Sequence, residues 1–171
     1  MAILVDDIVS RAQTVIQDTT AVRWPETELV QWINDAQREV INMTPRAGAK
    51  TVTHVLDNTD SKQVIPNDGV MLLRVVRNVG GRAIREVDRD IMDSQNPDWH
   101  EATGSTVLHY IHDPIDPQTF YVYPKASGSV EIVYCKSPST VAAGGNISIP
   151  DIYANAIWDY ILHRAYIKDA K

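Results

Sequence analysis

The sequence predicts an α+β fold in which an N-terminal helix pair and a C-terminal helix pack as a small bundle, with an inserted antiparallel β module. Hydrophobic residues recur with helical spacing in residues 1–49 and 151–171, whereas residues 50–150 contain short β-branched and aromatic runs separated by turn signals. A chain of 171 residues fits one domain, or one domain with a sizeable insertion. We therefore expect a helix pair in 1–49, a β module in 50–150, and a helix of the same bundle in 151–171.

Two amphipathic helices are predicted in residues 1–49. Asp6 and Asp7 complement the positive end of the first helix dipole, and Pro25 suits the first turn of the second helix, which ends before Pro45 and Gly48. The apolar positions expected to face the bundle are Val5, Ile8, Val9, Ala12, Val15 and Ile16, followed by Leu29, Trp32, Ile33, Ala36, Val40 and Met43. Because the connecting loop is short, we expect an antiparallel pair.

Residues 50–150 contain a series of short predicted strands. The runs are KTVTHVLD, KQVIP, MLLRVVRNV, RAIREV, TVLHYIH, TFYVYP and SVEIVYC. The pair Gly80-Gly81 predicts a tight hairpin turn, since glycine readily adopts a positive φ. Asp88 is a suitable cap for a helical turn in DRDIMDSQ. The spacing of runs and turns predicts a compact antiparallel β unit.

The stretch DPIDPQTFYVYP, residues 113–124, predicts a stiff loop that leads into an aromatic strand. An aspartate before proline favours extended or turn backbone, and its side chain can close an Asx-turn. The alternative is a catalytic carboxylate pair, which would need a cleft to perturb the two pKa values. Phe120 and Val122 share one face of the strand, so they can pack inward while Tyr121 and Tyr123 meet solvent or a partner.

The segment IYANAIWDYILHRAYIKDAK predicts a C-terminal helix that Asp151 caps. This segment is apolar nearly all round, so we expect other chain to cover it on more than one side. It reaches Lys171 without a Gly or Pro stop signal. Either the natural chain continues beyond Lys171 or the helix frays at a natural end.

Composition and charge narrow the function classes. Sixteen basic and 22 acidic residues give a net charge of −6, which disfavours general binding to nucleic-acid phosphates. The single cysteine, Cys135, rules out an internal disulfide. No apolar run approaches the ~20 residues that span a bilayer, and the start lacks the basic region of a signal peptide. We therefore expect no association with a membrane.

The sequence contains no evident catalytic or metal-binding motif. His109 and His112 are three residues apart in a predicted strand, so they should point to opposite faces and not converge on a metal with Asp113 or Asp116. The HExxH, CxxC, EF-hand, phosphate-loop and nucleophile-elbow patterns are absent from the sequence. We therefore expect a protein that is not an enzyme and that has no cofactor or metal.

Arginines cluster in the middle of the chain, at Arg74, Arg77, Arg82, Arg85 and Arg89. Arg74 and Arg77 are three residues apart on one predicted strand, as are Arg82 and Arg85, so regular alternation would split the charges across both faces. We expect these arginines to form salt bridges with a neighbouring subunit or with local acids rather than contacts with phosphate.

Four stretches in one order resemble the tailed-bacteriophage adaptor proteins, a family of head-to-tail connector or head-completion proteins. The stretches are RW followed by ELVQWINDAQRE, then NPDWH, DPQTFYVYP and YANAIWDYILHRAYIKDA, and the resemblance covers nearly the whole chain. It implies a structural virion protein at the head–tail junction, made in the bacterial host cytoplasm. Relatives continue past the KDA region with a helical segment expected to engage the portal, whereas this sequence stops at Lys171.

The resemblance also implies partners. They are the portal protein, a tail, nozzle or tail-tube protein, copies of the chain in a ring that is commonly a dodecamer, and DNA that passes through the lumen without sequence-specific binding. The candidate residues for subunit or partner contacts are Arg74, Arg77, Arg85, Trp99, Tyr121, Tyr123, Trp158, Tyr160, Arg164 and Tyr166. The alternative class is a carbohydrate-type ligand-binding α+β domain with stacking platforms at Trp99, Tyr110, Tyr121 and Tyr123.

Overall fold

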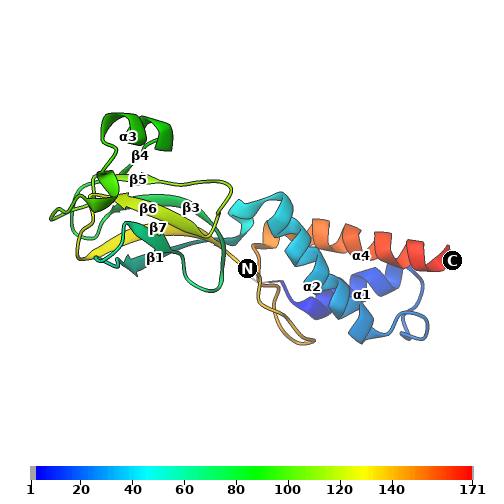
Figure 1. The fold of residues 1–171 in the computed structure, drawn as a ribbon. Helices are drawn as coiled ribbons and strands as arrows, with labels where there is room; N and C mark the ends of the chain where they lie inside the picture. The colour runs from blue at the N-terminus through cyan, green and yellow to red at the C-terminus, as the bar shows by residue number, and fades with distance from the viewer. Residues whose placement is uncertain (1–2, 171) are drawn as a thin grey trace. The chain divides into compact units, whose positions relative to one another are not determined.

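The structure is a computed structural model that describes residues 3–170. The chain divides into two compact units, which are labelled by element in Figure 1. The helical unit contains the chain up to Gly48 and from Ser137 onward, and the β unit is Ala49–Lys136. Helices near both ends and strands between them confirm the predicted α+β class.

The helical unit is built from three α-helices that pack against one another: α1 (Val5–Val15), α2 (Glu26–Met43) and α4 (Ala154–Asp169). Short 3-10 turns, η1 (Pro45–Gly48) and η3 (Asp151–Tyr153), follow α2 and precede α4. The buried apolar residues of these three helices are Val5, Ile8, Val9, Ala12, Leu29, Trp32, Ile33, Ala36, Ile41, Ile157, Ile161 and Ala165. The period of 3.6 residues thus predicts most of this core.

The predicted apolar stripes are wrong at the helix ends. Val15 and Met43, each the last residue of its helix, are exposed, and Met43 is 76% exposed. The buried residue near the end of α2 is instead Ile41. The predicted cap at Asp151 is also wrong, because Asp151 begins the 3-10 turn η3 and α4 starts only at Ala154.

Two buried polar residues of α2 hold the segment 137–150 in the helical unit. The Asn34 side chain donates to the Val141 carbonyl (3.0 Å) and accepts the Val141 N–H (2.8 Å). The Gln37 Oε1 atom accepts the N–H (2.7 Å) and the hydroxyl (2.9 Å) of Ser148. The side-chain amides of Asn34 and Gln37 thus provide hydrogen bonds that a neighbouring strand would otherwise provide. They hold the segment in place although it is not a strand.

The loop between α1 and α2 is closed by Asp18. Gln17 and Ala21, which flank this turn, have positive φ angles of 57° and 54°. The Asp18 carboxylate accepts the N–H groups of Val22, Arg23 and Trp24 at 2.8–3.0 Å. The hydrogen bond from the Trp24 N–H is the main cause that lowers the pKa of Asp18, while burial opposes it.

We expect Asp18→Asn to weaken the dependence of stability on pH in the acid range. Since the folded-state pKa lies below the ordinary value of 3.8, the carboxylate stabilises the folded state above that pH. This stabilisation is lost as the pH falls through the folded-state pKa. Urea unfolding at a series of pH values measures the effect, and an identical pH slope in both proteins would contradict it.

The β unit contains two packed sheets. One has the order β1-β7-β3, from β1 (Ala49–Val55), β7 (Ser129–Lys136) and β3 (Gly69–Asn78). The other has the order β2-β6-β5-β4, from β2 (Lys62–Val64), β6 (Thr119–Tyr123), β5 (His109–Ile111) and β4 (Arg85–Glu86). Buried residues of both sheets and of the adjoining loops form one core: Leu56, Ile65, Leu72, Val75, Ile84, Val107, Tyr110, Phe120, Val122, Ala126, Val130, Ile132 and Tyr134.

A short helical layer covers the other face of the second sheet. It contains α3 (Arg89–Gln95) and the 3-10 turn η2 (Trp99–Glu101), and Figure 1 shows α3 on the side of the β unit opposite β1. The Asp88 side chain accepts the Asp90 N–H, so the predicted cap of this helix is confirmed.

Strand β3 departs from the regular alternation that the sequence predicts. Its register against β7 shifts at three points, between Gly69 and Met71, Leu72 and Arg74, and Val75 and Arg77. Each shift adds a residue to β3, so two of its residues oppose one of β7. Every third residue of β3 is therefore buried, and the prediction that Arg74 and Arg77 lie on opposite faces is wrong: both are exposed, as partners of Val133 and Glu131.

The connection after β3 differs in part from a simple antiparallel unit. The predicted Gly80-Gly81 turn is confirmed, with φ of +72° at Gly80 and a bridge between Arg77 and Ala83. The next strand, β4, then pairs with β5 in parallel, although an entirely antiparallel module was predicted. The helical layer between β4 and β5 supplies the crossover that a parallel pair needs.

Candidate interaction surfaces

The loop at residues 113–118 is a set of hydrogen-bonded turns. Asp113 Oδ1 accepts the Ile115 N–H at 2.9 Å, which confirms the predicted Asx-turn. Asp116 Oδ2 accepts the Thr119 hydroxyl at 2.8 Å and lies 3.4 Å from Lys62 Nζ. The Thr119 hydrogen bond is the largest cause that lowers the pKa of Asp116. Both carboxylates therefore have structural partners that explain their positions.

The aromatic strand β6 packs on both faces. Phe120 and Val122 lie in the core between the sheets, while Tyr121 and Tyr123 pack against the cluster of Trp99, Met92 and Ile111, so the predicted alternation is confirmed. Trp99 is completely buried, its ring centroid is 5.8 Å from that of Tyr121, and its Nε1 donates to Asp93 at 2.7 Å.

This burial removes Trp99 from the residues that can meet a partner on the surface. It also argues against the carbohydrate-binding alternative, because Trp99 and Tyr110 are both buried. A stacking platform needs a ring face that a sugar can reach. Tyr121 and Tyr123 are half-buried, and their rings contact Trp99, His100 and His109.

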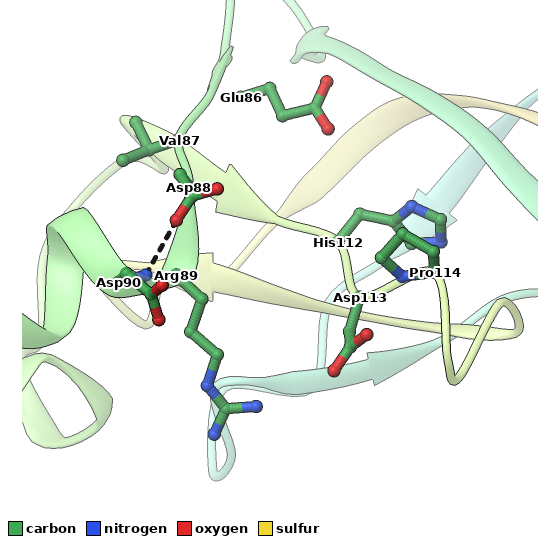
Figure 2. A pocket seen from close by; sticks show the side chains of 8 residues that line it. All are labelled: Glu86, Val87, Asp88, Arg89, Asp90, His112, Asp113 and Pro114. Atoms are coloured by element: carbon green, nitrogen blue, oxygen red, sulfur yellow. Dashed lines mark hydrogen bonds between the residues drawn. The ribbon is translucent and has the colours of Figure 1, made fainter.

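An acidic depression of about 490 Å³ lies where β4 leads into α3, next to the residues after β5. It is lined by Glu86, Val87, Asp88, Arg89, Asp90, His112, Asp113 and Pro114. Figure 2 shows the Asp88–Asp90 hydrogen bond at its edge and the side chains of Arg89 and Asp113 directed to the same side. Four carboxylates and one arginine line the depression, which favours a cationic group over an anionic one.

An arginine depression of about 530 Å³ adjoins the acidic one at Glu86. Its lining residues are Leu73, Arg74, Ala83, Ile84, Arg85, Glu86 and Tyr110. The Tyr110 hydroxyl donates to Glu86 at 2.9 Å, and burial together with this carboxylate raises the pKa of Tyr110 to about 12. Two candidate arginines, Arg74 and Arg85, are thus brought together, whereas Arg77 pairs with Glu131 at 3.0 Å.

The candidates on α4 are distributed over different parts of the helical unit. Trp158 lies under the Arg11 guanidinium, 4.0 Å from the ring centroid, in a groove with α1. Arg164 lies 5.7 Å from the Tyr160 ring. Tyr166 is 56% exposed and lines a separate pocket of about 260 Å³ beside Trp24. No single α4 site therefore unites them.

Sequence reasoning missed the acidic depression. The available signal is the acidic run around REVDRD, in which Asp88 is the predicted helix cap and the other acids are only local charges near the arginines. His112 and Asp113 complete the lining from a distant part of the sequence. Within residues 3–170, no group of three or more His, Cys, Asp or Glu residues is arranged to hold a metal ion.

The exposed apolar residues Tyr166 and Ile167 on α4 and the two charged depressions are surfaces that can contact other chains. The model of the SU10 adaptor protein family matches residues 4–171, and the chain belongs to this family of phage adaptor proteins. Membership implies a structural adaptor role in a phage. No curated protein matches the chain. In the part of the chain that the structure describes, no helix combines the length and apolarity needed to cross a membrane.

Proposed function

We propose that the chain forms the adaptor ring between the portal and the tail of a tailed phage, where it provides the platform for tail attachment. The observation that carries this proposal is the family match over residues 4–171, because it includes both the helical unit and the β unit. The ring contains copies of the chain, commonly twelve in such adaptors, in cyclic head-to-tail contact. Cyclic contacts join two different surfaces of each copy.

The exposed apolar and aromatic residues of the helical unit support a role in assembly. Ile152, Tyr166 and Ile167 are exposed although they are large and apolar, and Ile157, Ile161 and Ala165 bury only one stripe of α4. A helix with apolar residues outside its buried stripe is suited to contact a further chain. We assign the exposed part of α4, including Tyr166 and Arg164, to contacts with the portal or a neighbouring copy.

The charged depressions of the β unit support contacts of a different kind. The arginine depression fits an acidic group of the neighbouring copy or of a tail, nozzle or tail-tube protein, and the acidic depression fits a basic one. A net charge of −6 also suits a channel through which DNA slides without adhering to the wall.

The test is cryo-electron microscopy of the protein mixed with portal rings from the same phage genome. We expect a second ring of matching symmetry below the portal. The proposal would be overturned if the portal rings carried no added density while circular dichroism showed that the free protein is folded.

Charge reversal then tests the contact surfaces. Because Arg74 and Arg85 share a depression, the double variant Arg74→Glu/Arg85→Glu should reduce ring formation or tail attachment. The matched control is Arg38→Glu/Arg46→Glu, which changes the net charge equally at two other exposed arginines. Equal assembly of both variants would remove the arginine depression from the proposed contacts.

A further inference from the structure

Strand β1 has an open outer edge. It is the terminal strand of the β1-β7-β3 sheet, and Figure 1 shows no other strand of the β unit beyond it. Among residues 3–170, the backbone hydrogen bonds outside the β1–β7 ladder include none from Ala49–Val55. Five of its seven residues are exposed, and Val55 is 73% exposed.

The ladder with β7 determines which backbone groups of β1 face outward. Leu56 N–H donates to the Gly128 carbonyl at 2.9 Å, and this bond continues the register in which His54 pairs with Val130. Hydrogen-bonded pairs alternate with non-hydrogen-bonded pairs in an antiparallel ladder, so the even-numbered residues bond to β7. The N–H and C=O groups of the odd-numbered residues Ala49, Thr51, Thr53 and Val55 therefore point away from the sheet.

This edge has little of the usual protection against strand pairing. Natural edge strands are kept short or carry prolines, bulges or charged side chains, lysine above all. In contrast, β1 has seven residues, AKTVTHV, in an unshifted register, and its only formal charge at neutral pH is Lys50. The opposite edge of the same sheet differs, because the Arg77–Ala83 bridge and the Ile84 N–H to Val76 bond partly cover β3.

We propose that the outer edge of β1 pairs with β1 of a second copy in an antiparallel, two-fold contact. In the register centred on Val52, all seven residues pair: Val52 faces Val52, Thr51 faces Thr53, and Ala49 faces Val55 of the second copy. Lys50 faces His54 of the second copy and not another Lys50, so no like charges are opposed. The outward N–H and C=O groups of Thr51 then exchange hydrogen bonds with those of Thr53 of the second copy. The same pair occurs twice, once on each side of the two-fold axis.

The sequence of β1 can thus pair with itself over its full length, with strand-forming residues and with no like charges opposed. Besides β1 and the partly covered β3, the outer strands of the β unit are β2 with three residues and β4 with two. Both are too short to pair with all seven residues of β1 in a second copy. A two-fold contact does not generate a ring. We therefore assign the β1 pair to free protein that has not yet assembled into the ring. The inference therefore does not rest on the ring or on a portal.

Light scattering after size-exclusion chromatography of the purified full chain tests the oligomeric state. A contact made by one strand from each copy is small, so we expect a concentration-dependent equilibrium between monomer and dimer. Hydrogen exchange should slow at the Thr51 and Thr53 amides on dimer formation, while the Val52 and His54 amides, which bond to β7, should be protected in both states. A monomer at every concentration would overturn the proposal.

Charge variants at the exposed positions 51 and 53 test the register without touching the core. Thr51→Lys/Thr53→Lys opposes lysines in both pairs and should yield a monomer, whereas Thr51→Glu/Thr53→Lys places opposite charges in both pairs and should restore the dimer. Thr53→Pro removes an outward N–H, which does not bond to β7, and should also yield a monomer. A dimer that persists in the lysine variant, with folding confirmed by circular dichroism, would show that another surface forms it.

Discussion

Replacing Trp99 with alanine is expected to destabilise the β unit by about 3–5 kcal/mol, the usual effect of truncating a large buried aromatic residue. Trp99, the first residue of η2, is completely buried against the second sheet, where it packs with Met92, Ile111 and Tyr121. Its truncation leaves a cavity and also leaves the Asp93 carboxylate without its 2.7 Å indole donor. Urea unfolding followed by circular dichroism measures the loss.

Hydrogen exchange should locate this loss in residues 89–101, because Trp99 joins that layer to the second sheet. The matched control is Trp158→Ala in the helical unit, where the ring is only half-buried and contacts Arg11, so a smaller loss is expected. Equal stability of Trp99→Ala and the original protein would contradict the assignment of Trp99 to the core. The same result would readmit Trp99 as a surface contact.

The elements with strong local signals could be predicted from the sequence. The helical period located α1, α2 and α4, turn residues located the Gly80 turn and the Asp113 Asx-turn, and alternation located the two faces of β6. Each of these features depends on residues that are near one another in the chain. Their physical cause is therefore contained in a short stretch of sequence.

Strand β3 could not be predicted at the same level. Buried residues occur at every third position because three register shifts let β3 follow β7, whose own side chains alternate with a period of two. The shifts depend on the pairing of two segments that are far apart in sequence. Local alternation therefore assigned Arg74 and Arg77 to opposite faces, and only the pairing with Val133 and Glu131 corrects this.

The candidate surfaces were predictable only in part for the same reason. Arg74 and Arg85 were identified by residue type, but the depression that unites them depends on the turn after β3 and on Tyr110 from β5. In the sequence alone, Trp99 in the predicted loop could not be distinguished from an exposed aromatic residue. Its burial follows from the fold of η2 onto a distant sheet, which no short stretch of sequence encodes.

Asn78 at the end of β3 is expected to be a second residue on which the β unit depends. Its buried side chain donates to the carbonyl groups of Arg82 (3.1 Å) and Val107 (2.8 Å) and accepts the Val107 N–H (3.0 Å). Asn78→Leu would leave both backbone groups of the fully buried Val107 unpaired. Since each of the two unsatisfied buried groups costs about 1–3 kcal/mol, we expect a loss of about 2–6 kcal/mol.

The shift of the urea midpoint at a constant slope measures this loss, with Asn58→Leu at an exposed position as the control. The Asn78 side chain also fixes the turn that leads from Arg74 on β3 to Arg85 on β4. Asn78→Leu should therefore disturb the arginine depression without altering either arginine. If Asn78→Leu were as stable as the control, water or a rearranged loop would have to form the hydrogen bonds to the N–H and C=O groups of Val107. The position of the turn would then not depend on the Asn78 side chain.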